Sequence, residues 1–279
     1  MKFSKKITAS IAVIALIGIT AATAMSGSLY SPDKVTVPDG FSSLVFADEF
    51  DGDRQPDSTK WNYEIGYLRN GELQYYTPGN NVECADGVLA IELRNDSALM
   101  ENEICPVTSG SLTTLGLGSW KYGYFEVRAK LPASLGLWPS IRLLPAEQVY
   151  GDWPRSGEIE IMEHVGHTPD KIHFSAHSER FNFIRSTQRR FSASLPEAVG
   201  DFHIYALKWT PDELVWLFDG RPQFCVKRGE HEDWTTWPFD SEFYLVLNLA
   251  YGGNWGGAEG VDHSALPQRF EIDYVRIFQ

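Results

Sequence analysis

The chain has few cysteines, a shortage of positive charge and no long apolar segment after its N-terminus. Its 24 lysines and arginines stand against 37 aspartates and glutamates, which gives a formal net charge of −13. Nucleic acid and anionic membrane surfaces are poor partners for such a chain. It also lacks a Gly-x-Ser-x-Gly elbow and a Gly-x-x-x-x-Gly-Lys phosphate loop. We therefore expect no nucleic-acid partner and a chemistry other than that of serine hydrolases or nucleotide-binding enzymes.

Only three cysteines are present, Cys84, Cys105 and Cys225. In an oxidising compartment Cys84 and Cys105 could pair, and Cys225 would then be a free thiol that we expect to be buried in a strand. Three free thiols are the alternative, because sequence spacing alone does not fix a pairing.

Helical periodicity is also missing. No window of about 12 residues combines a 3.6-residue apolar period with caps, and the one helical candidate is a turn or two at Asp57–Lys60. Alternating or continuous apolar runs instead predict short strands with turn signals between them. Four of these runs are Phe125–Leu131, Leu214–Phe218, Phe243–Ala250 and Arg269–Phe278. Many strands and little helix predict an all-β fold, a two-sheet antiparallel β-sandwich.

The N-terminus has the pattern of a secretory signal. Lysines come first, Ile11–Ile19 is apolar, and Ala22-Thr23-Ala24 resembles a cleavage site. We therefore predict a signal peptide at residues 1–24, a linker at 25–39 and one domain at 40–279, secreted to the extracellular space or the periplasm. No other apolar run approaches the ~20 residues of a membrane span, so we expect no membrane association after signal removal. A retained N-terminal anchor is the alternative.

Residues 157–164, Gly-Glu-Ile-Glu-Ile-Met-Glu-His, place three carboxylates within six positions. On a strand Glu158 and Glu160 share one face, and Ile159 and Ile161 share the other. Glu163 is out of phase, and one extra residue in a β-bulge, most simply at Met162, brings it to the face of the other two acids. The sequence therefore predicts a bulged strand with a row of carboxylates.

Such a row suits the cleavage of a glycosidic bond. Neighbouring like charges raise one another's pKa, so at least one of the acids keeps its proton near neutral pH. A retaining glycosidase needs one ionised carboxylate as nucleophile and one protonated acid as proton donor. The alternative is a solvent-exposed acidic strand with no chemical role.

Further motifs lie before and after these acids. They are Asp48-Glu49-Phe50, Asn70-Gly71-Glu72-Leu73-Gln74-Tyr75-Tyr76, Gly136-Leu137-Trp138-Pro139, Trp153-Pro154-Arg155-Ser156-Gly157, Asn248-Leu249-Ala250-Tyr251-Gly252-Gly253-Asn254-Trp255 and Ile272-Asp273-Tyr274-Val275-Arg276. With them the sequence resembles glycoside hydrolase family 16, and within it the laminarinases, which are endo-1,3-β-glucanases. The resemblance covers nearly the whole predicted domain. It implies a jelly-roll sandwich with a concave substrate cleft.

The resemblance also implies roles for the three acids. Glu158 matches the family's nucleophile and Glu163 its general acid/base. The family pattern is Glu-Ile-Asp-Ile-Met-Glu, so Glu160 replaces an aspartate that hydrogen-bonds the nucleophile. This departure of one methylene group puts the rate and the pH optimum in question.

Several other residues match substrate-binding positions of the family. Flat apolar side chains with polar neighbours suit sugar rings, which have C–H faces and hydroxyl rims. The matching residues are Trp138, Trp153, Trp255, Asn70, Glu72, His177 and Asn248. Core packing is the alternative for Trp153, and a zinc pair of His173 with His177 is a disfavoured alternative, because no third ligand is evident.

The chain departs from the family at two further positions of the implied cleft. Ser111 stands where laminarinases have an arginine, and Arg142 stands where they have a tryptophan. We count Arg142 among the substrate-binding residues. The two changes could compensate for each other or alter a subsite, and the sequence leaves both open.

A structural calcium ion is implied as well. Family members often bind one through an aspartate of the last strand, which matches Asp273, with Glu49 and the backbone of Gly87 as partners. Carboxylate and carbonyl oxygens suit this hard cation. No cofactor is expected for catalysis.

The leading prediction is a secreted, monomeric, retaining endo-β-glucanase acting on 1,3-linked or mixed 1,3/1,4-linked β-glucans such as laminarin. A non-catalytic β-glucan-binding protein on the same fold is the rival. A third alternative is hydrolysis of a sulfated or galactose-based algal polymer, for which the additional cation Arg142 could matter.

Overall fold

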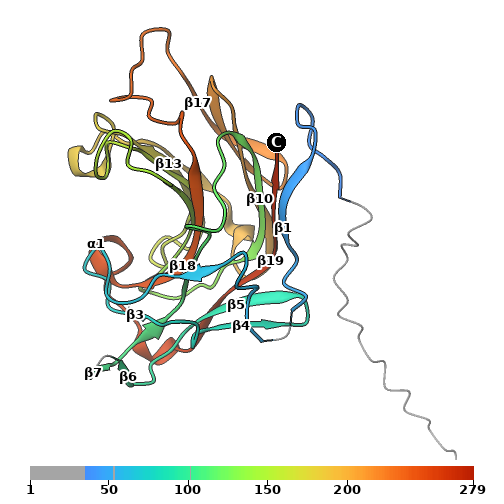
Figure 1. Ribbon diagram of the computed structural model, residues 1–279. Coiled ribbons are helices and arrows are strands. Elements are labelled where there is room, and N and C mark those ends of the chain that lie inside the picture. Colours follow the sequence, from blue (N-terminus) through green and yellow to red (C-terminus); the bar gives the residue numbers. More distant parts are fainter. Residues whose placement is uncertain (1–34, 53, 101) are drawn as a thin grey trace, which may run out of the picture.

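The computed structural model describes residues 35–52, 54–100 and 102–279 (Figure 1). The predicted signal peptide and most of the predicted linker lie outside these residues. Within the described residues, no helix has the length and apolar character needed to cross a membrane.

Eight strands form one sheet, which we call the outer sheet. They are ordered β17-β16-β15-β10-β19-β5-β4, and β1 also pairs with β19. All of these pairings are antiparallel, and Figure 1 shows β10, β19 and β1 side by side. The strands are β1 (Leu44–Asp48), β4 (Val82–Ala85), β5 (Val88–Leu93), β10 (Gly123–Lys130), β15 (Phe202–Trp209), β16 (Glu213–Phe218), β17 (Arg221–Lys227) and β19 (Gln268–Phe278).

Seven strands form the second sheet, which we call the site sheet because it carries the three acids. Their order is β14-β13-β12-β11-β18-β9-β2, again antiparallel throughout. The strands are β2 (Asn62–Tyr63), β9 (Ser111–Thr113), β11 (Leu137–Pro145), β12 (Glu158–Glu163), β13 (Lys171–His177), β14 (Arg189–Ser194) and β18 (Phe243–Tyr251).

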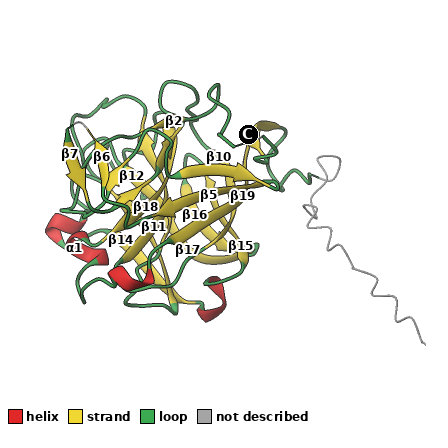
Figure 2. Cartoon of the chain, turned by 90° about the horizontal axis from the view of Figure 1, so that it is seen from below, coloured by secondary structure: helices red, strands yellow, loops and turns green. Residues whose placement is uncertain are grey.

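The remaining elements are small. Two short ribbons, β3 (Tyr75–Tyr76) with β8 (Thr108–Ser109) and β6 (Ala98–Met100) with β7 (Glu103–Cys105), lie outside the two sheets. The helical elements in Figure 2 are short segments between strands. They are α1 (Gly253–Gly256), η2 (Phe183–Arg185), η3 (Pro196–Ala198) and η4 (His263–Ala265).

At Asp57–Lys60, where the sequence predicts a turn or two of helix, the structure has a single hydrogen-bonded turn that does not continue into a helix. The backbone N–H groups of Lys60 and Trp61 both donate to the Asp57 carbonyl, which closes a single turn. The Asp57 carboxylate accepts hydrogen bonds from the backbone and the hydroxyl of Thr59. A bond from the backbone N–H two residues on to an aspartate side chain is typical of turns and helix N-caps.

The core lies between the two sheets and follows from strand alternation. On β10, Phe125, Val127 and Ala129 are buried, while the residues between them are partly exposed. Ile159 and Ile161 of β12 belong to the same buried cluster. Burial of such side chains contributes about 1.5–3 kcal/mol each relative to exposure. The predicted two-sheet sandwich is confirmed, and the four predicted strands correspond to β10, β16, β18 and β19.

The three cysteines are all free thiols. Cys84 and Cys105 are buried, but Cys225 is exposed, so the prediction that Cys225 is buried was wrong. Cys225 lies on β17, which among the described strands pairs with β16 alone and forms an edge of the outer sheet. An edge strand is covered by fewer neighbours, so an apolar run there does not ensure burial.

Candidate active site

The three acids of β12 share one face of the site sheet, as predicted. Glu158, Glu160 and Glu163 are 8%, 4% and 7% exposed. A β-bulge makes this phase possible, since Met162 pairs with Ile141 and Glu160 with Arg142, which leaves Ile161 without a partner on β11. The bulge is therefore confirmed: Ile161 is the extra residue against β11, and neither Ile161 nor Met162 is paired with β13. The sequence pattern requires one extra residue between Glu160 and Glu163 to bring the acids to one face, and either Ile161 or Met162 could be that residue.

The bulge is anchored from beneath by the outer sheet. The indole Nε1 of Trp216, on β16, donates a hydrogen bond of 2.7 Å to the backbone carbonyl of Glu160. Trp216 is fully buried, so this bond crosses the core. A buried carbonyl without a partner would cost free energy, and the indole removes that cost where the bulge disturbs the ladder.

Alternate residues of β11 supply one contact to each acid. Trp138 Nε1 donates to Glu163 Oε1 at 3.0 Å, and Ser140 Oγ donates to Glu160 Oε2 at 3.1 Å. Arg142 Nη1 lies 4.0 Å from Glu158 Oε1. Sequence reasoning missed Ser140, although its spacing of two residues from both Trp138 and Arg142 places all three on one face of a strand.

A second donor reaches Glu158 from the loop before β12. Trp153 Nε1 donates to Glu158 Oε2 at 2.8 Å. Glu158 therefore faces an indole N–H and a guanidinium, whereas neither Glu160 nor Glu163 has an ion-pair partner among the described residues. The negative charge of the cluster is favoured on Glu158.

Burial and the repulsion between the carboxylates determine which of the three acids keep their protons. Burial first, and then the Glu158 charge, raise the pKa of Glu163 to about 8, against a smaller opposing effect of the Trp138 hydrogen bond. Burial also raises the pKa of Glu160 well above its ordinary value, and the charges of its two neighbours and a hydrogen bond to Glu158 act in the same direction. Burial and the repulsion between the acids therefore favour the protonated forms of Glu160 and Glu163.

Two histidines of β13 flank the acids on the side of β12 that faces away from β11. His177 pairs with Glu158 and His173 with Glu163 in the strand register. Burial lowers the pKa of His177, and it lowers that of His173 to about 4, so both rings are neutral at pH 7. The described residues contain no group of three metal-binding side chains, which gives the disfavoured zinc alternative no third ligand.

The predicted substrate-binding residues gather around the acids. Asn248 pairs with Ser140 in the sheet and donates through Nδ2 to the Tyr76 hydroxyl, which donates to Glu72. Asn70 Nδ2 donates to the same Glu72 carboxylate at 3.1 Å. The Trp255 ring packs edge-on against Trp138, with centroids 5.4 Å apart, and against His173. These residues continue the polar and aromatic surface beyond Glu163.

The two departures from the family have structural counterparts. Ser111 donates to Glu64 at 2.7 Å, and Glu64 forms an ion pair with Arg69. An arginine from the β2–β3 loop thus lies near the position of the missing one, and sequence reasoning overlooked both Glu64 and Arg69, because a loop residue has no periodicity to place it. Arg142 is 6% exposed, and its Nε and Nη2 atoms have no hydrogen-bond partner.

The residues predicted to hold calcium do not fit the ion in this arrangement. Asp273 accepts a hydrogen bond of 2.6 Å from Arg128, and both oxygens of Glu49 accept from Arg276 at 2.8 Å. A Cβ at Gly87 would lie 3.4 Å from an oxygen of Asp51, which places Gly87 beside that carboxylate. A cation at Asp273 or Glu49 would compete with guanidinium groups for the same oxygens. The calcium ion stays a prediction.

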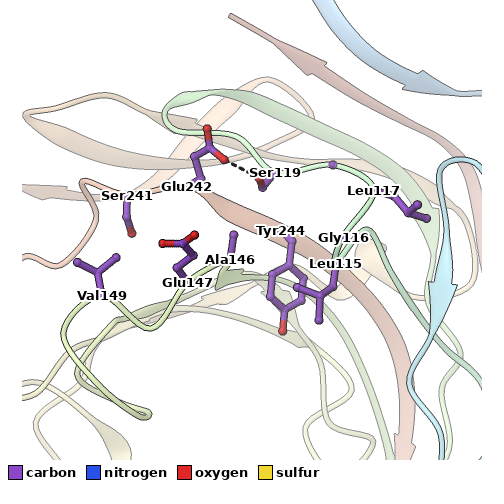
Figure 3. Close-up of a pocket in the computed structure, with 11 residues that line it drawn as sticks. Leu115, Gly116, Leu117, Ser119, Ala146, Glu147, Val149, Ser241, Glu242 and Tyr244 are labelled. Atoms are coloured by element: carbon purple, nitrogen blue, oxygen red, sulfur yellow. Dashed lines mark hydrogen bonds between the residues drawn. The ribbon is translucent and has the colours of Figure 1, made fainter.

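A cavity of about 720 Å³ lies at one end of the site sheet, where β11 ends and β18 begins (Figure 3). Ser119 donates to Glu242 at 2.7 Å within it. The Tyr244 ring lies beside Leu115, and the Tyr244 hydroxyl points away from Ser119 and Glu242. None of the predicted site residues lines this cavity.

Comparisons with known proteins agree with this geometry. A model of the family described as glycosyl hydrolases family 16 matches residues 71–276. A beta-glucanase from Rhodothermus marinus is 44% identical over 246 residues, covering 85% of each chain. The X-ray structure of the laminarinase from Rhodothermus marinus superposes with a TM-score of 0.81 at 44% identity, over 85% of this chain and 96% of that one.

A structure described as a non-specific endo-beta-1,3(4)-glucanase from family GH16 gives a TM-score of 0.82 at 40% identity. It covers 88% of this chain and 93% of the other. The similarity therefore extends over nearly all of the described sandwich.

Proposed function

The chain belongs to family 16 of the glycosyl hydrolases, and from that premise we propose that Glu158 is the nucleophile and Glu163 the general acid/base of a retaining endo-β-glucanase. The chain is an O-glycosyl hydrolase with a jelly-roll sandwich. The proposed substrates are 1,3-linked and mixed 1,3/1,4-linked β-glucans such as laminarin, since the similar proteins are named for these activities.

In the first step a Glu158 oxygen attacks the anomeric carbon as the bond from that carbon to the glycosidic oxygen breaks. The Glu163 proton passes to the departing oxygen, which leaves as a hydroxyl group, and a glycosyl ester forms on Glu158. In the second step Glu163 takes a proton from water, whose oxygen attacks the anomeric carbon and releases Glu158. Two inversions at that carbon retain its configuration.

The observation that carries this proposal is the unequal environment of the outer acids. Glu158 faces the N–H of Trp153 and the guanidinium of Arg142. Glu163 is buried, and its pKa is raised to about 8. A carboxylate pair with such different surroundings supplies an anion and a proton donor at the same pH. We therefore expect kcat/KM to fall as the pH rises through about 8, where Glu163 loses its proton.

Burial and the neighbouring charges raise the pKa of Glu160 and so favour its protonated form. Its carboxyl hydrogen-bonds Glu158 and accepts from Ser140. A protonated neighbour that donates to the nucleophile orients the attacking oxygen and can accommodate the change of charge when the ester forms. We propose this role for Glu160.

Product analysis against laminarin, lichenin, agarose and carrageenan tests the proposed function. We expect laminarin, and more slowly lichenin, to yield oligosaccharides whose first-formed anomer, read by NMR, has the β-configuration of the substrate. First-formed α-products would contradict the retaining mechanism. Cleavage of agarose or carrageenan alone would favour the galactan alternative.

The non-catalytic alternative is a β-glucan-binding protein. It would retain laminarin on an affinity gel without shortening it. The paired Glu158 and Glu163, with their opposed environments, favour the enzyme, because a binding surface has no need of a protonated buried acid.

We also propose that the mature protein begins after residue 24, is exported to the periplasm or the medium, and acts as a monomer. The lysine-led apolar N-terminus supports the proposed export. Mass spectrometry of the N-terminus from each cell fraction, with light scattering on the purified protein, tests these proposals.

A further inference from the structure

An exposed tryptophan stacks on a tyrosine at the end of the sandwich where β17 connects to β18. Trp234 of this connection is 39% exposed. Its ring centroid lies 5.4 Å from that of Tyr150 in the β11–β12 loop, and the two ring planes meet at 12°. Because Tyr150 covers one face of the indole, the exposed area belongs to the other face and the edge. We call this pair of rings the aromatic platform.

Both rings of the aromatic platform are held in place. The Tyr150 hydroxyl donates to Asp240 Oδ1 at 2.9 Å, which joins the two loops. In the β17–β18 connection, the backbone carbonyl of Asp233 accepts a hydrogen bond of 2.7 Å from the backbone N–H of Trp237, which is fully buried. A surface that is ordered before a ligand arrives loses little conformational entropy on binding.

The platform is separate from the three acids of β12. Burial, a hydrogen bond to Asp240 and the charge of Asp240 raise the pKa of Tyr150, and the charge of Arg228 opposes them. Burial raises the pKa of Tyr244 to about 12, and the Glu158 charge acts in the same direction. Tyr244 therefore lies within the field of the acids, whereas Tyr150 lies within that of the β17–β18 connection.

Open space and hydrogen-bonding groups border the platform. Val149 and Ser241, the sequence neighbours of Tyr150 and Asp240, line the cavity of about 720 Å³ in Figure 3. The same cavity is lined by two carboxylates, those of Glu147 and Glu242. A flat apolar surface beside acceptors for hydroxyl groups suits a sugar ring, which has C–H faces and a hydroxyl rim.

We propose that the aromatic platform is a second sugar-binding surface, outside the catalytic cleft, which holds a neutral β-glucan chain while another part of the polymer is cleaved. The choice of polymer rests on the proposed function. Trp234 stacks on the face of one glucose unit, and the carboxylate of Asp240 accepts hydrogen bonds from its hydroxyl groups. A polymer held at a second point stays near the cleft between cleavages, which raises its effective concentration there.

The charge of the β17–β18 connection favours a neutral polymer. Residues 228–240 contain four acids and one arginine. Of these acids, Glu232 forms an ion pair with Arg189 of β14, and the remaining three exceed the single arginine of the segment. A sulfated or uronic-acid polymer would meet this excess negative charge, whereas a neutral glucan carries no charge to be repelled.

Binding to curdlan, an insoluble linear 1,3-β-glucan, tests the platform. Trp234→Ala should raise the apparent Kd for curdlan particles about tenfold, equivalent to the loss of one aromatic contact, and should lower kcat/KM on curdlan with it. Cleavage of soluble laminaritetraose should keep its kcat/KM, because catalysis on a short chain needs the cleft alone.

Phe191→Ala is the matched control. Phe191 is 43% exposed, and its ring stacks on Phe224 with centroids 5.9 Å apart and planes at 21°. Its removal should leave the Kd for curdlan and kcat/KM on both substrates unchanged. Trp234→Phe, which keeps a ring at the platform, should bind curdlan more tightly than Trp234→Ala.

Equal binding of curdlan by the Trp234→Ala and Phe191→Ala proteins would overturn the platform. An equal loss of kcat/KM on curdlan and laminaritetraose would also overturn it, since Trp234 would then act through the cleft.

If the unsubstituted protein cleaves neither substrate, the proposed function fails and curdlan binding alone measures the platform. Weaker binding by the Trp234→Ala protein than by the Phe191→Ala protein then supports the platform. Failure of the unsubstituted protein to bind curdlan contradicts it.

Discussion

Two buried arginines, one in each sheet, have opposite surroundings. Arg276 of the outer sheet forms two hydrogen bonds of 2.8 Å to the Glu49 carboxylate and lies over the Tyr274 ring. Arg142 of the site sheet is equally buried, but it reaches its carboxylate only at 4.0 Å and keeps two atoms unpartnered.

The two arginines therefore differ in what their pairing contributes to the stability of the fold. A bidentate pair satisfies both charged groups within the folded chain, so its loss affects folding. Incomplete pairing leaves buried donors unsatisfied within the folded chain, which costs stability. The same contrast holds for carboxylates: Glu49 is paired twice, whereas Glu163 has a single indole donor.

The largest expected effect is at the nucleophile. Glu158→Gln should lower kcat on laminarin by about 10⁴-fold, because an amide cannot form the glycosyl ester, while the melting temperature changes little. Release of reducing ends, measured with circular dichroism on the same samples, checks this.

Glu271→Gln in the outer sheet, where Glu271 pairs with Lys130, is the matched control and should retain full activity. Undiminished activity in the Glu158→Gln protein would remove Glu158 from the mechanism.

Breaking the paired arginine should have the reverse outcome. Glu49→Ala removes both hydrogen bonds that the buried Arg276 guanidinium makes to the Glu49 carboxylate, and should lower the free energy of unfolding by about 3 kcal/mol with kcat/KM unchanged. Urea denaturation measures this change in the free energy of unfolding. Lys208→Met, which breaks the more exposed pair with Glu213, should cost about 1 kcal/mol or less. Equal costs for the two variants would contradict the comparison.

The pH dependence of stability should depend on Glu163. Its pKa is raised from 4.5 to about 8 on folding, so the folded state binds a proton that the unfolded state has lost between these values, and stability falls as the pH rises. Glu163→Gln removes this titration and should flatten the decline by about 2–4 kcal/mol between pH 5 and pH 8. Thermal unfolding across that range measures the slope. A slope as steep as that of the unsubstituted protein would show that Glu163 is ionised when folded.

Restoring the family's aspartate tests the middle acid. Glu160→Asp shortens the side chain that hydrogen-bonds Glu158 and accepts from Ser140, and should change kcat on laminarin about threefold to tenfold through the orientation of the nucleophile. Rate profiles against pH show whether the basic limb moves with it. Ser140→Ala should change kcat in the same direction if the hydrogen bond matters, and no change in either variant would exclude a role for Glu160.

The smallest effect is expected from metal removal. Because Glu49 and Asp273 already pair with arginines, dialysis against a chelator should lower the melting temperature by less than about 1 °C, well below the roughly 2–4 °C that 1 kcal/mol produces in a chain of this size. A drop of about 5 °C or more, reversed by added calcium, would support the predicted calcium site.

Strand alternation made much of this fold predictable. On β10 the buried and partly exposed residues alternate without interruption, and on β12 the parity of three acids required a bulge. Local pattern could not say which residue bulges, because Ile161 and Met162 are both apolar and fully buried. It also misjudged Cys225, whose burial depends on the strand order of the sheet.

Tertiary position determined the rest of the site. Arg69 and Phe183 lie in loops, and their contacts with Glu64 and Trp153 join residues held in place by different strands. No periodicity in the sequence marks such residues. Ser140 was within reach of sequence reasoning, since it lies midway between Trp138 and Arg142 on the same face of β11.

The hydrogen bond from Trp216 to the Glu160 carbonyl means that the opposite sheet helps to set the position of the acids. The side chains around them, such as Arg142 and Phe183, come from other segments of the chain. Evolution can therefore exchange those side chains, and with them the preferred polysaccharide, while the catalytic geometry is inherited from the core. The resemblance to the family implies that Arg142, in place of a tryptophan, is one such exchange.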